Sequence, residues 1–142
     1  MFKTIALALD GSEASERAVS AAADLAQQDH AKIVVVHVEE DVAGKGWSGP
    51  VHLDEDEIQA KIRKQAEELA NQGIDTSVEM RRTILGGPAA VITEVAEEAG
   101  ADVIVTGSRG RSLIPGLLVG SVASRLLHLA HRPVLVIPPP QS

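Results

Sequence analysis

The sequence contains no cysteine among its 142 residues. This absence excludes disulfide bonds, thiolate metal sites and cysteine nucleophiles, and it leaves the redox compartment open. No apolar run approaches the roughly 20 residues that a membrane-spanning helix requires. The opening segment MFKTIALALDGSE also lacks the basic region and the small-residue cleavage site of a secretory leader. These absences predict a cytoplasmic protein that does not insert into membranes.

Positive charge is scarce, because 13 Lys and Arg residues face 20 Asp and Glu residues and the net charge is −7. This balance argues against non-specific binding to nucleic acid, which needs positive charge against the phosphates. The charges are unevenly spread, since residues 101–142 hold four arginines and one acidic residue, Asp102. An anion site, if the chain has one, is expected in this last third. Chance clustering of surface arginines explains the same distribution.

Strand and helix patterns alternate along the chain. Continuous apolar runs typical of strands buried on both faces occur at 5–9, 33–38, 102–106 and 133–137. The more alternating segment 76–83 suits an edge strand. Helical spacing of apolar residues follows Ser12 and recurs over about 54–72, 88–99 and 119–131.

This alternation predicts one α/β domain over residues 1–142, with a parallel sheet covered by helices on both faces. In such sheets, ligands bind beyond the carboxyl ends of the strands, where the strand order reverses. The segments that follow the first, second and fourth strands are therefore the places to search for a site.

The strongest chemical signal is a spaced glycine motif, Gly-Ser-Arg-Gly at 107–110 and Gly-Ser at 120–121, between a buried strand and a helix. Glycines let backbone N–H groups approach an anion without an obstructing Cβ. A helix N-terminus offers unpaired N–H groups and a partial positive charge, which suits phosphate. Ser121 adds a hydroxyl donor, and Arg109 and Arg111 add countercharge. The alternative is a glycine-rich loop that only makes a tight turn.

The spacing Gly-x2-Gly-x9-Gly-Ser resembles the nucleotide-binding signature of the universal stress protein family. The similarity covers essentially the whole chain, and it extends to segments 9–12, 37–38, 101–110 and 133–137. The resemblance implies a five-stranded parallel sheet in the order 3-2-1-4-5, the adenine nucleotide alpha hydrolase-like fold. It also implies membership of the family's ATP-binding branch, with Mg²⁺ or Mn²⁺ on the phosphates.

Residue by residue, the resemblance puts Asp10 near the ribose and phosphates, and the backbone of Val38 against adenine. The nucleotide-binding set that it implies is Leu9, Asp10, Val38, Gly107, Arg109, Gly110, Gly120, Ser121 and Val122. This chain departs from the family at Ala123, where a hydroxyl is common, and one phosphate contact is in doubt. The alternative for Asp10 is a local turn or helix cap, and the alternative for Val38 is core packing.

Other motifs are weaker. Residues 44–49 spell G-x-G-x-x-G, but they follow the second strand at a distance and Pro50 precedes the next helix, so we interpret them as a loop. Trp47 could cover a nucleotide there. No P-loop motif occurs. The five histidines lack metal-ligand spacing, and His37 is expected to be a hydrogen-bonded core residue.

Three functions remain open from the sequence. The first is an ATP-binding stress-response or regulatory module with slow or absent hydrolysis, since no water-activating base is evident except Asp10. The second is a weak metal-dependent ATPase in which Asp10 assists the metal or the water. The third is an interaction protein without bound nucleotide. An apolar edge strand, Pro133–Ile137, could pair with a second copy to form a homodimer.

Overall fold

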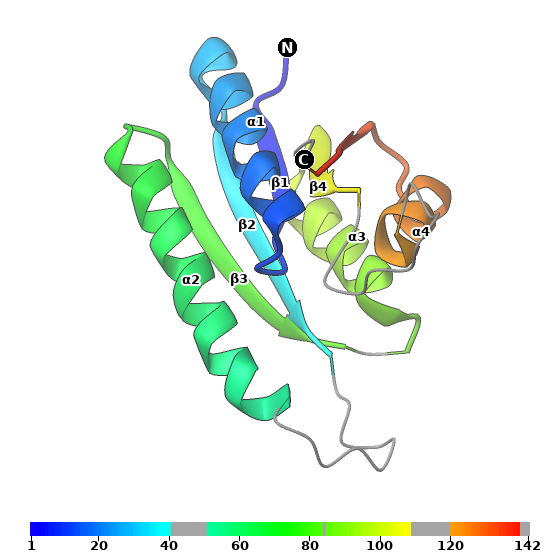
Figure 1. Cartoon of the computed structure of the whole chain (residues 1–142). Helices are drawn as coiled ribbons and strands as arrows, with labels where there is room; N and C mark the ends of the chain where they lie inside the picture. Colours follow the sequence, from blue (N-terminus) through cyan, green and yellow to red (C-terminus); the bar gives the residue numbers. More distant parts are fainter. Residues whose placement is uncertain (41–50, 84, 109–119, 140–142) are drawn as a thin grey trace.

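The computed structural model describes residues 1–40, 51–83, 85–108 and 120–139, with side chains from Glu55 onward in the second range. Five strands and four helices alternate along these residues (Figure 1). Their bounds are β1 (Thr4–Ala8), α1 (Glu13–Asp29), β2 (Lys32–Glu39), α2 (Val51–Asn71), β3 (Thr76–Arg82), α3 (Gly87–Ala99), β4 (Val103–Gly107), α4 (Ser121–Leu129) and β5 (Val134–Ile137).

The strands form one parallel sheet in the order β3-β2-β1-β4-β5. This confirms the predicted fold class and strand order. The chain builds outward from β1 through β2 to β3, and then crosses back to β4 and β5 on the other side of β1. The strand order therefore reverses between β1 and β4. Among the described residues, no helix is both long and apolar enough to cross a bilayer.

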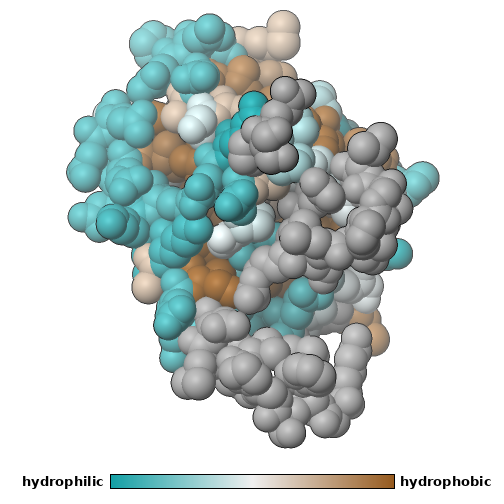
Figure 2. Space-filling view, viewed as in Figure 1, coloured by the Kyte–Doolittle hydropathy of each residue, from teal (hydrophilic) through white to brown (hydrophobic). Residues whose placement is uncertain are grey.

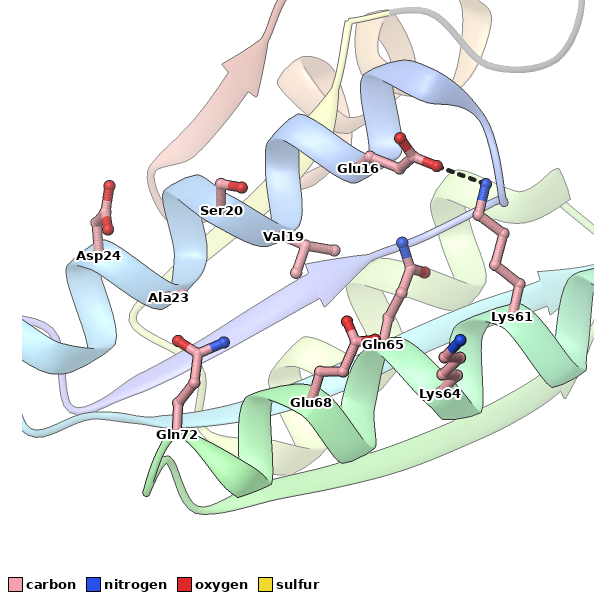
Figure 3. A pocket seen from close by; sticks show the side chains of 10 residues that line it. All are labelled: Glu16, Val19, Ser20, Ala23, Asp24, Lys61, Lys64, Gln65, Glu68 and Gln72. Carbon is pink, nitrogen blue, oxygen red and sulfur yellow. Dashed lines mark ion pairs between the residues drawn. The ribbon is translucent and has the colours of Figure 1, made fainter.

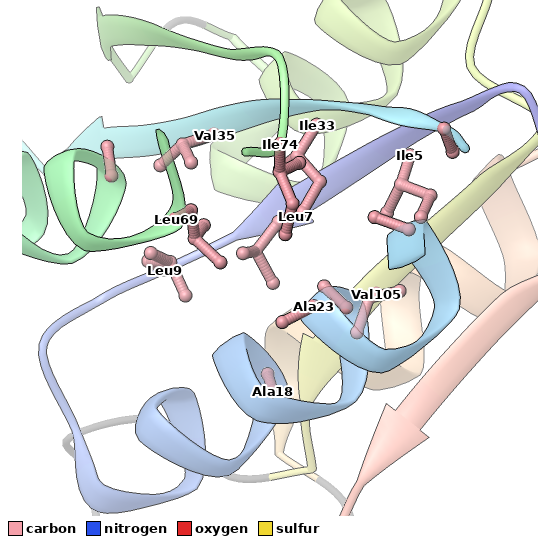
Figure 4. Packing of buried hydrophobic residues seen from close by; sticks show 14 of the residues in the cluster. Ile5, Leu7, Leu9, Ala18, Ala23, Ile33, Val35, Leu69, Ile74 and Val105 are labelled. Carbon is pink, nitrogen blue, oxygen red and sulfur yellow. The ribbon is translucent and has the colours of Figure 1, made fainter. Parts of the chain in front are cut away.

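Strand periodicity divides the core into two layers, because successive side chains point to opposite faces of a sheet. Ile5 and Leu7 of β1 point toward α1 and α2, where they meet Leu69 among other residues of the first layer (Figure 4). Ala6 and Ala8 point toward α3 and α4 and join the second layer. Both faces are apolar, which is why the strands appear in the sequence as uninterrupted hydrophobic runs.

Helix α1 presents small side chains to the sheet. Ala14, Ala18, Ala22 and Ala26 recur every four residues, and each is 4% exposed or less. Ser12 caps the helix as predicted, because its Oγ accepts from the Ser15 amide at 3.2 Å. The alanine face lets α1 lie close to the sheet, which matters at the end of β4.

The carboxylate of Asp102 joins the start of β4 to the start of β1. Its Oδ2 accepts from the amides of Lys3 at 2.8 Å and Thr4 at 3.0 Å. These two backbone N–H groups stabilise the charged form, so they lower the pKa of Asp102. A carboxyl group of this kind stabilises the fold above its unfolded pKa, about 3.9, and loses that stabilisation as the pH falls through its folded pKa.

We therefore expect Asp102→Asn to lower stability at neutral pH and to weaken the acid dependence of unfolding below about pH 4. Urea unfolding of both proteins at a series of pH values measures this. Asp56→Asn, at an exposed position on α2, is the matched control and should follow the unmodified chain. Identical acid slopes for Asp102→Asn and the unmodified chain would contradict the assignment.

Candidate functional site

The candidate site is the carboxyl edge of the sheet where β1 and β4 run side by side. Leu7 of β1 pairs with Val105 of β4 in register, so the two strands end at the same edge. The chain leaves β1 toward α1 on one face and leaves β4 toward α4 on the other (Figure 1). This is the arrangement in which open α/β sheets bind their ligands.

The exit of β1 is fixed by hydrogen bonds. The amide of Leu9 donates to the Val36 carbonyl at 2.9 Å. Beyond it, Asp10 Oδ1 accepts from the Ser12 amide at 2.9 Å, and the Asp10 amide donates to Ser15 Oγ at 3.2 Å. The local turn that the sequence allowed for Asp10 is therefore present. It holds a half-buried carboxylate at the edge where a ligand would lie.

Gly107 ends β4 where the strand meets the first turn of α1. A Cβ at this position would lie 2.9 Å from the Ala14 Cβ and 3.1 Å from the Ala14 carbonyl carbon. No real side chain fits at such distances, so close packing alone requires glycine here. The contact also brings the start of α1 and the end of β4 together at one point of the candidate site.

Helix α4 begins without a side-chain cap. Its N-cap residue is Gly120, whose backbone is extended at φ −73° and ψ 172°. The Gly120 amide donates to the Ser108 carbonyl, which ties the helix start to the end of β4. The first amides of an α-helix have no partner within the helix, and no side chain serves as an N-cap acceptor at Gly120. Among the described residues, the sheet edge therefore adjoins a helix N-terminus without a side-chain cap, whereas Ser12 caps that of α1.

The first residues of α4 face different surroundings. Ser121 is exposed, and Val122 is half-buried against the second core layer. Ala123 is 2% exposed, so the position where the family often has a hydroxyl is packed inward. Ser124 is exposed one residue later. Ser121 therefore offers an exposed hydroxyl in the first turn of the helix.

Of the remaining predicted site residues, Val38 lies near the end of β2. The last paired residues of β1 and β2 are Ala8 and Val36, so the backbone at Val38 lies alongside the exit of β1. Its side chain is half-buried in the second core layer, which agrees with the packing interpretation. Arg109 and Gly110, together with Trp47 in the second glycine motif, lie outside the described residues.

Two of the four arginines in the last third have structural tasks. Arg132 donates through Nη1 to the carbonyls of Ala96 at 3.0 Å and Ala101 at 2.8 Å, and so closes the end of α3. Arg125 donates to the Gly86 carbonyl at 3.4 Å. The charge asymmetry thus reflects the fold in part, and the other two arginines, Arg109 and Arg111, lie outside the described residues.

Sequence reasoning missed two features of this edge. Ser108 is 4% exposed, and its Oγ has no hydrogen-bond partner among the described residues. It lies inside the glycine motif, which was the available signal. The second feature is a contact between His37 and Glu55, described below, for which the sequence gives no signal because a long segment separates the two residues. The prediction that His37 is a hydrogen-bonded core residue is confirmed.

A separate groove of about 520 Å³ lies between α1 and α2 on one face (Figure 3). Val19 and Ala23 line it together with charged and amide side chains, and Lys61 pairs with Glu16 across it at 2.8 Å. In the space-filling view, hydrophilic side chains dominate the outer surfaces of these two helices (Figure 2). The groove lies along the helix layer rather than at the β4–α4 edge, so we do not include it in the candidate site.

A family model described as the universal stress protein family matches residues 1–138. The chain belongs to the universal stress protein family. It is 33% identical over 147 residues to universal stress protein YxiE of Bacillus subtilis, an alignment that spans 96% of this chain and 99% of that one.

Two solved structures of universal stress proteins contain a nucleotide. One, from Archaeoglobus fulgidus in complex with dAMP, is 26% identical, with a TM-score of 0.66, and the match covers 96% of this chain and 98% of that chain. The other, in complex with cAMP, is 27% identical, with a TM-score of 0.65, and the match covers 96% of each chain. Nucleotides therefore bind to members of the family that share this fold.

Proposed function

We propose that this universal stress protein is an ATP-binding regulatory module of the cytoplasm, with slow or absent hydrolysis. The observation that carries the proposal is the uncapped start of α4 beside the ends of β1 and β4. The amides of the first turn, which have no acceptor within the helix, the exposed Ser121 hydroxyl and the helix dipole suit a phosphate chain. The dAMP and cAMP complexes of related proteins support an adenine nucleotide as the ligand.

In this proposal each predicted residue has a place. Asp10 lies near the ribose and phosphates, the backbone at Val38 meets the adenine, and Mg²⁺ or Mn²⁺ accompanies the phosphates. The full set is Leu9, Asp10, Val38, Gly107, Arg109, Gly110, Gly120, Ser121 and Val122. Hydrolysis is expected to be slow, because the sequence offers no evident water-activating base other than Asp10, whose Oδ1 already accepts from the Ser12 amide.

Calorimetry with Mg-ATP and the purified chain tests this function. We expect one nucleotide per chain and a rise in melting temperature that grows with nucleotide concentration. Mass spectrometry of the supernatant after denaturation identifies any nucleotide that copurifies. The absence of heat at saturating Mg-ATP, with no shift in melting temperature, would refute the proposal.

The second candidate function is a weak metal-dependent ATPase. It is favoured by the Asp10 carboxylate, which lies just beyond the end of β1 at the candidate site. Phosphate release by the purified protein distinguishes the two functions. An ATPase predicts turnover that Asp10→Ala abolishes while binding persists, whereas a regulatory module predicts release no faster than in buffer.

A homodimer through β5 is part of the proposal. Both edges of the sheet are strands, but they differ in character. Arg81 of β3 pairs with Glu79 and Glu98, each at 3.2 Å, so charges cover that edge. The β5 edge consists of Val134–Ile137, and Leu135 is 38% exposed. An apolar edge with unpaired backbone groups invites pairing with another strand.

We expect Leu135→Lys to shift the chain from dimer to monomer, because a charge on the paired edge opposes association. Sedimentation velocity over a range of micromolar concentrations measures this. Ser77→Lys, at an exposed position on the opposite edge strand β3, is the matched control and should leave the dimer intact. A monomer for the unmodified chain at all concentrations would contradict the proposed assembly.

A further inference from the structure

A buried histidine joins three elements beside the candidate site. His37 of β2 is 4% exposed. Its Nδ1 lies 2.8 Å from the carbonyl oxygen of Leu9, at the exit of β1. Its Nε2 lies 3.0 Å from Oε2 and 3.2 Å from Oε1 of Glu55, in the second turn of α2. We refer to His37, Glu55 and the Leu9 carbonyl as the clasp.

The hydrogen-bond chemistry of the clasp requires an extra proton. The Leu9 carbonyl can only accept, so Nδ1 must carry a hydrogen. The carboxylate of Glu55 also only accepts, and therefore Nε2 needs a hydrogen or the carboxyl group must be protonated. The clasp forms completely only when the pair holds one proton more than a neutral imidazole and a carboxylate would. Histidine is the side chain whose charge ordinarily changes between about pH 5 and 8.

The other charged groups near the ring are paired with residues other than His37. From β3, the residue in register with His37 is the uncharged Met80. Glu39, the next residue of β2 on the same face, lies 3.5 Å from Arg82 and forms an ion pair with it.

On the α1 and α2 side, Lys61 pairs with Glu16 at 2.8 Å and donates to the Gly11 carbonyl at 3.0 Å. Asp10 accepts from the Ser12 amide. The charged partner that the described residues place against the ring is Glu55.

We propose that His37 and Glu55 are positioning residues for the nucleotide site, and that the proton they share makes nucleotide affinity depend on pH. This inference rests on the proposed function. Leu9 immediately precedes Asp10, so the clasp holds the backbone that presents the Asp10 carboxylate. When the proton leaves, the lone pair of Nε2 faces the carboxylate and the contact becomes repulsive. The connection of His37 to α2 is then broken, and the Nδ1–H bond to the Leu9 carbonyl is left without the support of Glu55.

Deprotonation is therefore expected to loosen the exit of β1. A buried carbonyl without a donor is costly, so any movement of the ring away from Leu9 disfavours the present backbone. Release of Glu55 is less costly, because its side chain is already 17% exposed. Either change leaves Asp10 less firmly placed.

Two variants separate the shared proton from simple packing. In Glu55→Gln, the side-chain amide can donate to a neutral Nε2, so the clasp forms without the extra proton. Glu57→Gln removes the same charge from an exposed position on the same helix and serves as the matched control. Both substitutions are conservative and leave His37 in place.

The first measurement is Mg-ATP affinity at pH 6 and pH 8. For each protein we compare the affinity at pH 6 with the affinity at pH 8. We expect this ratio to be about threefold larger for the unmodified chain and for Glu57→Gln than for Glu55→Gln. Comparison between variants cancels the titration of ATP itself. Equal pH dependence in Glu55→Gln and the unmodified chain would overturn the inference.

The second measurement needs no nucleotide. In NMR titrations of the free protein, the amides of Asp10 and Gly11 should shift with the same midpoint as the His37 ring, and Glu55→Gln should remove this common midpoint. If the chemical shifts of these amides do not change with the protonation of His37, the inference is refuted. If they follow it but no ATP binds at any pH, the proposed function and the affinity effect are refuted, and the proton-dependent exit of β1 stands.

Discussion

Gly120→Asp is expected to lower the affinity for Mg-ATP by about 30-fold while the nucleotide-free protein becomes slightly more stable. Gly120 is the N-cap of α4 and has no side chain to accept from the helix amides. An aspartate there would accept from the amides proposed to bind phosphate, and its charge would oppose the anion. Lost charge-assisted hydrogen bonds and unfavourable charge at a helix start together reach about 2 kcal/mol.

The opposite signs of the two effects make the experiment decisive. An N-cap aspartate in place of glycine stabilises a helix by roughly a few tenths of a kcal/mol, so urea unfolding should show no loss of stability. Gly120→Asn is the matched control, because asparagine occupies the same amides without the charge. Its affinity should lie between those of the unmodified chain and the aspartate variant. Unchanged affinity in Gly120→Asp would mean that phosphate does not bind at this helix.

Gly107→Ala is expected to destabilise the fold by about 1–3 kcal/mol, the usual cost of forcing extra volume into a packed region. The new Cβ would lie 2.9 Å from the Ala14 Cβ and 3.1 Å from its carbonyl carbon. One of these neighbours is backbone, so the strain cannot be relieved by turning a side chain. The end of β4 and the start of α1 must separate, and nucleotide affinity should fall with them.

A double-mutant cycle with Ala14→Gly tests this cause. Ala14→Gly alone should cost about 0.5–1 kcal/mol, because glycine is unfavourable within a helix. The double variant should be more stable than the sum of the two single effects predicts, since the closest contact is gone. Additive effects would show that the close approach does not explain the glycine. Unfolding free energies in urea measure all four proteins.

Most of the fold was predictable because its signals are local. Strands buried on both faces appear as apolar runs, and caps such as Ser12 appear as single residues. The predicted and observed ends of some helices and strands differ by a few residues. The fourth helix was predicted from Val119, but the structure starts it at Ser121 because Gly120 is extended. The strand order came from the family resemblance, and the structure confirms it.

The site was less predictable because its decisive contacts are distant in sequence. Gly107 was singled out as a residue that leaves space for a ligand, yet its contact with Ala14 on α1 already requires glycine. The charge excess in the last third suggested an anion site, but Arg132 serves the end of α3. His37 and Glu55 meet across two elements, and no spacing rule connects them.

One residue links the proposed ligand site to the proposed dimer edge. The Ser108 amide donates to the Ile137 carbonyl of β5 at 2.7 Å, and the Ser108 carbonyl accepts from Gly120 at the start of α4. The proposed ligand site and the proposed dimer edge therefore share one residue, Ser108. A shift of that helix on phosphate binding would reach the edge strand through these two hydrogen bonds. Such a short connection would couple nucleotide binding to the contact between subunits without a hinge or a second domain.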